Sequence, residues 1–262
     1  MSRPSPLIQR SFPQPGIALL ALNRPEARNA LNLALLNELN REIEELSNDE
    51  TIRVLVLHGA GDVFCAGLDL KEAQQEELAE ESGQAVASAL EKLYNSPLVT
   101  IAAVHGAAIA GGGGLMAACD LIVAAEGTQI GFPETRRGLV AAIILALLHR
   151  QIPDHHLREL LFVGNLISAE RAERIGLVNR VVALQNVVEE ALEMAAKVLQ
   201  GAPDATVLSK QLLNKVTGEP LSSEIEYNLK QHMHARHGEE ALEGIRAFTE
   251  KREPRWKAKR TV

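Results

Sequence analysis

Apolar residues form two kinds of pattern along the chain. Short unbroken runs predict buried strands, because a strand that is covered on both faces needs apolar side chains on both. These runs are residues 17–22, 52–57, 98–104 and 121–124. Between them, residues 33–46 and 86–94 carry apolar side chains at helical spacing. Strands that alternate with helices indicate an α/β architecture with covered sheets.

The pattern changes after about residue 200. Residues 205–216 and 222–250 have the spacing of successive helices, with no strand between them. We therefore expect a core of strands and helices over residues 1–200. Residues 201–262 are expected to form a helical oligomerisation or lid region rather than an independent domain.

Composition and charge narrow the classes of partner. The chain has 262 residues and a net charge of −7, and only 3% of its residues are aromatic. An acidic protein with few aromatic rings is poorly suited to nucleic acid or to an anionic membrane. Residues 1–14 contain no apolar run, and the longest apolar stretch, residues 139–148, is too short to span a bilayer. We therefore expect a cytoplasmic protein, with Cys65 and Cys119 as reduced thiols.

Four consecutive glycines, residues 111–114, stand between a predicted strand and a predicted helix. Such a loop is either a tight turn or a place where free backbone N–H groups bind a phosphate or a developing oxyanion. A phosphate-binding P-loop needs Lys followed by Ser or Thr, but Leu115 and Met116 follow the glycines. Glu126 gives only weak support for a dinucleotide fold, and no serine stands at the loop tip as a hydrolase requires.

Three segments lie around predicted strand ends: DVFCAGLDLKE at residues 62–72, VHGAAIAGGGGL at residues 104–115, and IGFPE at residues 130–134. Together they resemble the crotonase (enoyl-CoA hydratase/isomerase) family. Further matches are NRPEARNAL at residues 23–31, CD at 119–120, SAERA at 168–172, GLVN at 176–179 and AFTEKR at 247–252. The resemblance runs from about residue 17 to about residue 256.

The resemblance implies a crotonase-like spiral of repeated β-β-α units with a C-terminal helical oligomerisation region. It also implies an acyl-CoA substrate, with coenzyme A entering as part of that substrate and no other cofactor. A homotrimer or hexamer is the expected assembly. No metal is expected, since His232, His234 and His237 do not share one helix face.

The resemblance carries roles onto particular residues. The backbone N–H groups of Leu68 and Gly111 match the two donors of an oxyanion hole, although Leu68 is equally suited to a core position. Glu134 matches an acid–base glutamate, although a surface glutamate at a helix start would look the same. The residues that match positions around coenzyme A are Ala27, Arg28, Ala66, Asp69, Leu70, Gly112, Phe248 and Lys251.

One departure from the family pattern affects the expected reaction. The first glutamate of the family's hydratases falls on Gly114, and the second carboxylate of its dienoyl-CoA isomerases falls near Ala142. We expect residue 114 to lie near the reacting carbons, so that hydration of a short 2-enoyl-CoA is slow. The leading activities are isomerisation by proton transfer at Glu134 and hydration with this single glutamate. The alternatives are thioester hydrolysis or decarboxylation on the same oxyanion hole, and a CoA-binding homologue without catalysis.

Overall fold

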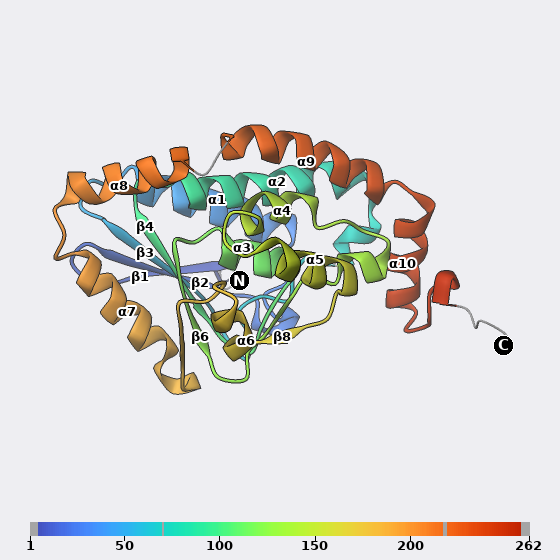
Figure 1. Cartoon of the computed structure of the whole chain (residues 1–262), viewed down its shortest axis with the longest axis horizontal. Helices are drawn as coiled ribbons and strands as arrows, with labels where there is room; N and C mark the ends of the chain where they lie inside the picture. Colours follow the sequence, from blue (N-terminus) through green and yellow to red (C-terminus); the bar gives the residue numbers. More distant parts are fainter. Residues whose placement is uncertain (1–4, 70, 217–218, 258–262) are drawn as a thin grey trace.

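A computed structural model describes residues 5–69, 71–216 and 219–257. Its centre is a six-stranded sheet in the order β1-β2-β3-β4-β6-β9 (Figure 1). The strands are β1 (Ile8–Gln14), β2 (Ile17–Leu22), β3 (Val54–Gly59), β4 (Val99–Val104), β6 (Leu121–Ala125) and β9 (Arg180–Val182). Strand β1 is antiparallel to β2, and the remaining neighbours are parallel.

A smaller sheet of three strands has the order β5-β7-β8. Its strands are β5 (Ala107–Ile109), β7 (Gln129–Gly131) and β8 (Ile167–Ser168). Along the chain, a strand of the large sheet is followed by a strand of the small sheet and then by a helix. This order occurs with β4, β5 and the helix α3 (Gly111–Ala117), and again with β6, β7 and the segment that leads to α4 (Ala142–Leu148). This repetition is the spiral of β-β-α units that the sequence predicts.

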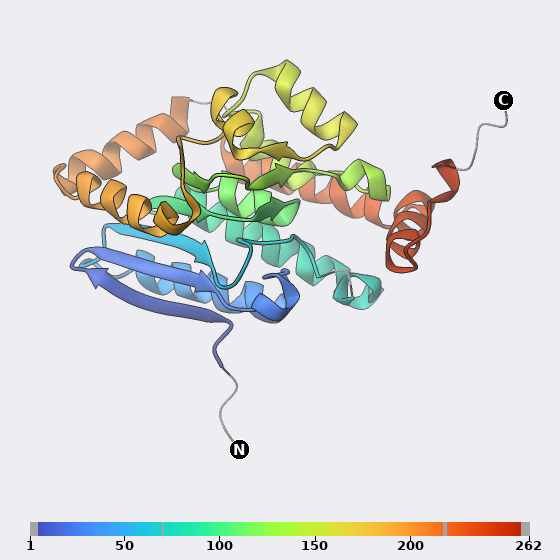
Figure 2. The ribbon, with the colours of Figure 1, turned by 90° about the horizontal axis from the view of Figure 1, so that it is seen from below.

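Helices cover both faces of the large sheet, as Figures 1 and 2 show. Alternate residues of β2, β3, β4 and β6 pack on α7 (Val187–Val198), through Val187, Ala191 and Ala195. The opposite side chains of these strands pack on α1 (Leu33–Ser47) and α2 (Glu76–Asn95). The remaining helices are α5 (Asp154–Val163), α6 (Ala169–Arg174), α8 (Pro203–Val216), α9 (Leu221–Arg236) and α10 (Glu239–Thr249). Short 3₁₀ turns include η1 (Pro25–Ala27), η2 (Glu72–Gln74) and η3 (Glu134–Arg137).

The predicted strands and helices are confirmed, mostly with small changes at their ends, but α2 begins at Glu76, ten residues before the predicted start at residue 86. The predicted helix over residues 222–250 is two helices, because the chain turns at His237 and Gly238 between α9 and α10. Strand β1 was not predicted. Its residues after Ile8 are exposed, so this edge strand lacks the apolar run by which the central strands were found. Both cysteines are free and buried, as expected.

In the described part of the chain, no helix is both long enough and apolar enough to cross a membrane. After residue 200, the described residues form helices and no strand, as predicted. They pack on the core: α9 lies along α2 and α4 (Figure 1), and α10 packs against η3. The C-terminal helices therefore take part in enclosing the space around η3.

An ion pair between the buried Lys210 and the more exposed Asp120 fastens α8 to the large sheet. Lys210 Nζ lies 2.7 Å from Asp120 Oδ2 and 2.9 Å from the carbonyl oxygen of Leu98. The same carboxylate oxygen accepts hydrogen bonds from the backbone N–H and the hydroxyl of Thr100, at 2.8 and 3.0 Å. Asp120 thus joins two strands and a helix that lie far apart in the sequence.

We predict that Asp120→Ala lowers the free energy of unfolding by about 3 kcal/mol, because it leaves the Lys210 ammonium group buried without its counter-charge. Lys210→Met removes the buried charge and keeps much of the side-chain volume, so its cost should be smaller. Urea unfolding of both variants measures the difference. An equal loss of unfolding free energy in the two variants would contradict the idea that the unpaired Lys210 charge causes most of the destabilisation in Asp120→Ala.

Candidate active site

A cavity of about 550 Å³ opens beside the N-terminus of α3. Its walls come from the turn at residues 24–31, the segment after β3, α2, the start of α3, η3 with the loop to α4, and α9. These segments are distant in sequence but meet at one end of the molecule. The cavity therefore depends on the tertiary fold rather than on a single loop.

The segment at residues 65–69 is held between two neighbours by backbone hydrogen bonds. On one side, Leu31 N–H donates to Gly67 O at 2.7 Å, and Asp69 N–H donates to Leu31 O at 2.9 Å. On the other side, Cys65 N–H donates to Ala107 O at 3.0 Å, and Ile109 N–H donates to Cys65 O at 3.1 Å. Successive amides in an extended segment point to opposite sides. Since Asp69 N–H points towards Leu31, the preceding amide, that of Leu68, points away from Leu31.

The backbone just before α3 leaves donors without acceptors. Ala110 precedes the helix with φ 50°, a left-handed value that is uncommon for a residue with a Cβ atom. The first helical hydrogen bond runs from Gly114 N–H to Ala110 O, at 2.9 Å. The N–H groups of Gly111, Gly112 and Gly113 thus remain outside the helical ladder. Within the described residues, neither Gly111 N–H nor Leu68 N–H has a protein acceptor.

The glycines let α3 approach the segment at residues 65–69 closely. A Cβ atom on Gly112 would stand 2.4 Å from the carbonyl oxygen of Cys65, which no side chain tolerates. A Cβ atom on Gly111 would stand 4.0 Å from the backbone nitrogen of Leu68. The two unbonded amides therefore lie on neighbouring backbones at the cavity wall. In addition, the helix N-terminus contributes a partial positive charge to this place.

Glu134 begins η3 and is 7% exposed. Its Oε2 atom is buried and has no hydrogen-bond partner in the described part of the protein. Burial raises the pKa of the carboxyl group to about 7, while a backbone hydrogen bond and the charge of Arg137 act in the opposite direction. A carboxyl group with this pKa exchanges its proton readily near neutral pH.

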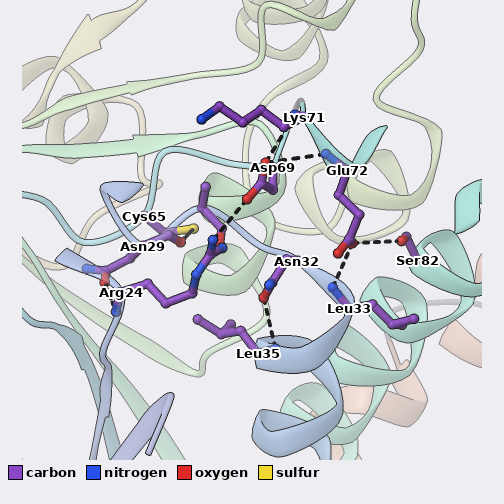
Figure 3. A network of polar contacts seen from close by, with 11 residues as sticks. Arg24, Asn29, Asn32, Leu33, Leu35, Cys65, Asp69, Lys71, Glu72 and Ser82 are labelled. Carbon is purple, nitrogen blue, oxygen red and sulfur yellow. Dashed lines mark hydrogen bonds and ion pairs between the residues drawn. The ribbon is translucent and has the colours of Figure 1, made fainter. Parts of the chain in front are cut away.

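The other acidic side chains at the cavity differ from Glu134. Asp69 accepts a hydrogen bond from Arg24 Nη2 at 3.0 Å, and Glu72 accepts from Leu33 N–H at 2.7 Å and from the Ser82 hydroxyl at 3.3 Å (Figure 3). Burial alone would raise the pKa of the Asp69 carboxyl group, but hydrogen bonds from Arg24 and from two backbone amides lower it overall. Both carboxylates thus stabilise the turn and the start of α1. Glu26, which also lines the cavity, is exposed.

Arg137 places a positive charge close to Glu134. Its guanidinium group lies over the ring of Phe248, 4.4 Å from the centroid. Burial lowers the pKa of Arg137, and the charge of Glu134 partly opposes this shift. Both Arg137 and Phe248 line the cavity, and they connect η3 to α10. The sequence analysis did not single out Arg137.

The structure brings most of the predicted site residues together. Those that line the cavity are Ala27, Arg28, Ala66, Leu68, Asp69, Gly111, Glu134 and Phe248. Gly112 packs on Cys65 instead, and Lys251 is exposed after α10 and does not line this cavity. Leu70 lies outside the described residues. No cluster of possible metal ligands occurs among the residues described.

Gly114 is placed differently from our expectation. It is buried and does not line the cavity. A Cβ atom at this position would stand 3.1 Å from Ile144 Cγ1 and 3.4 Å from Leu90 Cδ1. Ile144, which does line the cavity, fills the space into which a longer side chain at residue 114 would extend. This part of the wall is therefore apolar.

The sequence analysis also missed His232, which is buried, belongs to α9 and lines the cavity. A signal was present in the spacing. The buried face of α9 includes Leu221, Ile225, His232 and Arg236. His232 and Arg236 continue the apolar stripe of Leu221 and Ile225 at helical spacing, and this spacing predicts that both polar side chains lie on the buried face of the helix.

The comparisons with known proteins agree with this architecture. A family model described as enoyl-CoA hydratase/isomerase matches residues 13–259. A Thermus thermophilus protein with a provisional enoyl-CoA hydratase name is 37% identical over 92% of this chain and 97% of its own. The mevalonyl-coenzyme A hydratase of Aspergillus fumigatus is 35% identical over 94% and 93%. A crystal structure of an enoyl-CoA hydratase from Mycobacterium avium has a TM-score of 0.85 and 32% identity, and covers 96% of this chain and 99% of that one.

The chain therefore belongs to the enoyl-CoA hydratase/isomerase (crotonase) family, and its fold is the crotonase fold. It is an acyl-CoA enzyme of this family. The family and fold that the sequence motifs implied are confirmed.

The raised pKa of Glu134 predicts a stability difference that is independent of any substrate. Ionisation of Glu134 in the folded state is unfavourable, so stability is full below the unfolded pKa of 4.5 and is lost as pH rises towards 7. The neutral variant Glu134→Gln lacks this loss. It should be more stable than the unchanged protein by about 3 kcal/mol above pH 7, and by little at pH 4.

Urea unfolding across this pH range, at one protein concentration, measures the effect. Glu126→Gln provides the control, because Glu126 is exposed. A stability gain for Glu134→Gln that does not change with pH would contradict a shifted pKa at this residue.

Proposed function

We propose that the protein transfers a proton between carbon atoms of an acyl-CoA thioester, as an enoyl-CoA isomerase, with Glu134 as the acid–base group. The observation that supports this proposal is one buried carboxyl group whose Oε2 atom has no hydrogen-bond partner, in the same cavity as two unbonded backbone amides. The other carboxylates whose contacts are described there are held by the protein's own donors.

The two amides supply the electrostatic part of the mechanism. When Glu134 removes a proton from the carbon next to the thioester, the electron pair moves onto the thioester oxygen. Leu68 N–H and Gly111 N–H donate hydrogen bonds to that oxygen, and the start of α3 stabilises its negative charge. One such donor typically contributes about 3–4 kcal/mol to transition-state stabilisation. Since the donors are backbone groups, the leucine side chain at residue 68 does not interfere.

A single carboxyl group is enough for isomerisation. Glu134 takes the proton from the carbon next to the thioester and returns it to a carbon further along the conjugated enolate, so no proton is gained or lost. A general base of this kind typically accelerates a reaction about 10²–10⁴-fold. Arg28 and Phe248, at the cavity wall, are proposed to contact coenzyme A.

Hydration is the second candidate, because both relatives described above carry hydratase names. Adding water across the double bond is easier with a second carboxyl group that holds the water. Gly114 has no side chain, and the space beside it is filled by Ile144, which lines the cavity, and by Leu90 behind the wall; none of these residues has a side chain that binds water. We therefore place isomerisation first and hydration second.

Glu134→Gln should lower isomerisation of a 3-enoyl-CoA about 10³-fold or more, while the affinity for coenzyme A thioesters stays nearly unchanged. In the unchanged protein, kcat/KM should rise with pH through about 7, because the reacting form of Glu134 is the carboxylate. Formation of the conjugated 2-enoyl-CoA is followed by its absorbance. Glu126→Gln is again the control. Turnover by Glu134→Gln within a few-fold of the unchanged protein would remove Glu134 from the mechanism.

The hydration candidate is tested at residue 114. Because Ile144 occupies the adjacent space, Gly114→Glu alone should add little hydration of a short 2-enoyl-CoA. The double variant Gly114→Glu, Ile144→Ala makes room for the carboxyl group and should raise hydration about tenfold or more over Ile144→Ala alone. Adding Glu134→Gln should abolish the gain. Fast hydration by the unchanged protein would refute the order of our two candidates.

A further inference from the structure

The cavity is also lined by a histidine that the proposed mechanism does not use. His232 belongs to α9, which lies along α2 and α4 (Figure 1). It is one of the buried residues of that helix. The residue is 9% exposed and lines the same cavity as Glu134. It is thus a polar group among apolar neighbours such as Val86, Leu139 and Ile143.

One nitrogen of this imidazole is fixed by the backbone. His232 Nδ1 lies 3.1 Å from the carbonyl oxygen of Val140. A carbonyl oxygen only accepts hydrogen bonds, so Nδ1 carries the proton. Burial lowers the pKa of His232, and the charge of Arg236 acts in the same direction, whereas the bond to Val140 opposes them. The ring is therefore neutral at physiological pH, and its Nε2 atom is a hydrogen-bond acceptor.

Nε2 has no hydrogen-bond partner among the described residues, and it is not one of their fully buried unpartnered atoms. Since the residue as a whole is nearly buried, the small exposed part of this ring borders the cavity. The fixed Nδ1 also relates the ring to the reaction centre. Leu139 N–H donates to the carbonyl oxygen of Glu134 at 3.0 Å, and the next residue, Val140, accepts from His232.

We propose that His232 accepts a hydrogen bond from a hydroxyl group on the acyl chain, so that the substrates are CoA thioesters whose acyl group carries a hydroxyl beyond the reacting carbons. This inference rests on the proposed function only for the position of the thioester. The apolar wall packs on the hydrocarbon part of the chain, and the imidazole receives its polar group.

The energetics favour a donor over a plain alkyl chain. An alkyl chain that displaces water from Nε2 leaves a buried acceptor unpaired, which is unfavourable. A hydroxyl group provides the missing donor. Sites built around such a bond discriminate strongly against ligands that lack the hydroxyl, because the polar group of the site then stays unsatisfied. A carboxylate on the acyl chain has no proton to donate to Nε2. Because the positively charged Arg236 lines the same cavity, an acyl chain that ends in a carboxylate is the most informative ligand to compare with the hydroxylated one.

Binding of unreactive ligands tests the proposal without relying on turnover. Isothermal titration calorimetry compares ω-hydroxyacyl-CoA thioesters of increasing length with saturated acyl-CoA thioesters and ω-carboxyacyl-CoA thioesters of the same lengths. We expect at least one hydroxyacyl-CoA to bind about tenfold more tightly than both of its matched ligands. If no hydroxyacyl-CoA is preferred, or if the carboxyacyl-CoA binds most tightly, the proposal is wrong.

Variants assign the preference to His232. His232→Leu should reduce it to within about twofold, and His232→Gln, which keeps an acceptor oxygen, should restore part of it. His234→Leu is the matched control, since His234 is on the same helix and exposed. Thermal unfolding of each variant shows that it is folded. The assignment to His232 would be wrong if folded His232→Leu still preferred the hydroxyacyl-CoA. It would also be wrong if His232→Gln and the control His234→Leu both lost that preference.

Kinetics separate this proposal from the proposed function. If His232 instead held a reacting water or proton, His232→Leu would lower kcat for plain and hydroxylated enoyl-CoA alike, and the substrate proposal would be wrong. Failure of the protein to isomerise any enoyl-CoA, with the binding preference intact, would overturn only the isomerase proposal.

Discussion

The close approach of α3 to residues 65–69 is the constraint on which the site depends. Cys65 pairs with β5 on one side, and Leu68 bridges to Leu31 on the other, so the segment cannot shift by one residue without losing both sets of bonds. The contact between Gly112 and the Cys65 carbonyl brings the start of α3 beside it. Leu68 and Gly111 both line the cavity, and the N–H group of neither residue has an acceptor among the described residues.

The turn at residues 24–31 supports the same segment from outside. Asn29 is fully buried with φ 53°, and its side-chain amide donates to the carbonyl groups of Ala60 and Val63. Arg24 binds Asp69, and Ala66 N–H donates to Arg28 O. The polar groups around the cavity are thus largely used to hold backbone in place. Glu134 Oε2 is not used in this way, and the ionisation of this carboxyl group is correspondingly unfavourable in its buried position.

Four strands of the large sheet (β2, β3, β4 and β6) and helix α1 could be predicted because each has a clear local pattern: residues 17–22 are apolar throughout, and residues 33–46 repeat at helical spacing. Helix α7 and the first half of α2 were not predicted. Family motifs also placed Leu68, Gly111 and Glu134, which line one cavity. The remainder depends on contacts between distant segments. Strand β1 has no apolar run, and β5, β7 and β8 are too short to show a pattern. The contact between Ile144 and Gly114 depends on how α4 packs, and the position of His232 at the cavity depends on how α9 packs. The spacing of residues along the chain does not predict either packing arrangement.

Backbone groups and side chains have different proposed roles at the cavity: backbone N–H groups stabilise the enolate oxygen, and side chains determine which reaction follows. The proposed oxyanion donors are main-chain N–H groups, whose chemistry does not depend on the side chain at position 68, and such donors can stabilise the enolate in several different reactions. Acid–base groups and water-holding groups are side chains, and a single replacement changes them. Here the missing side chain at Gly114 is matched by the bulk of Ile144, which keeps the wall packed rather than leaving a wet gap. That pairing of a small residue with a large one is the packing feature on which the proposed preference for proton transfer over attack by water rests.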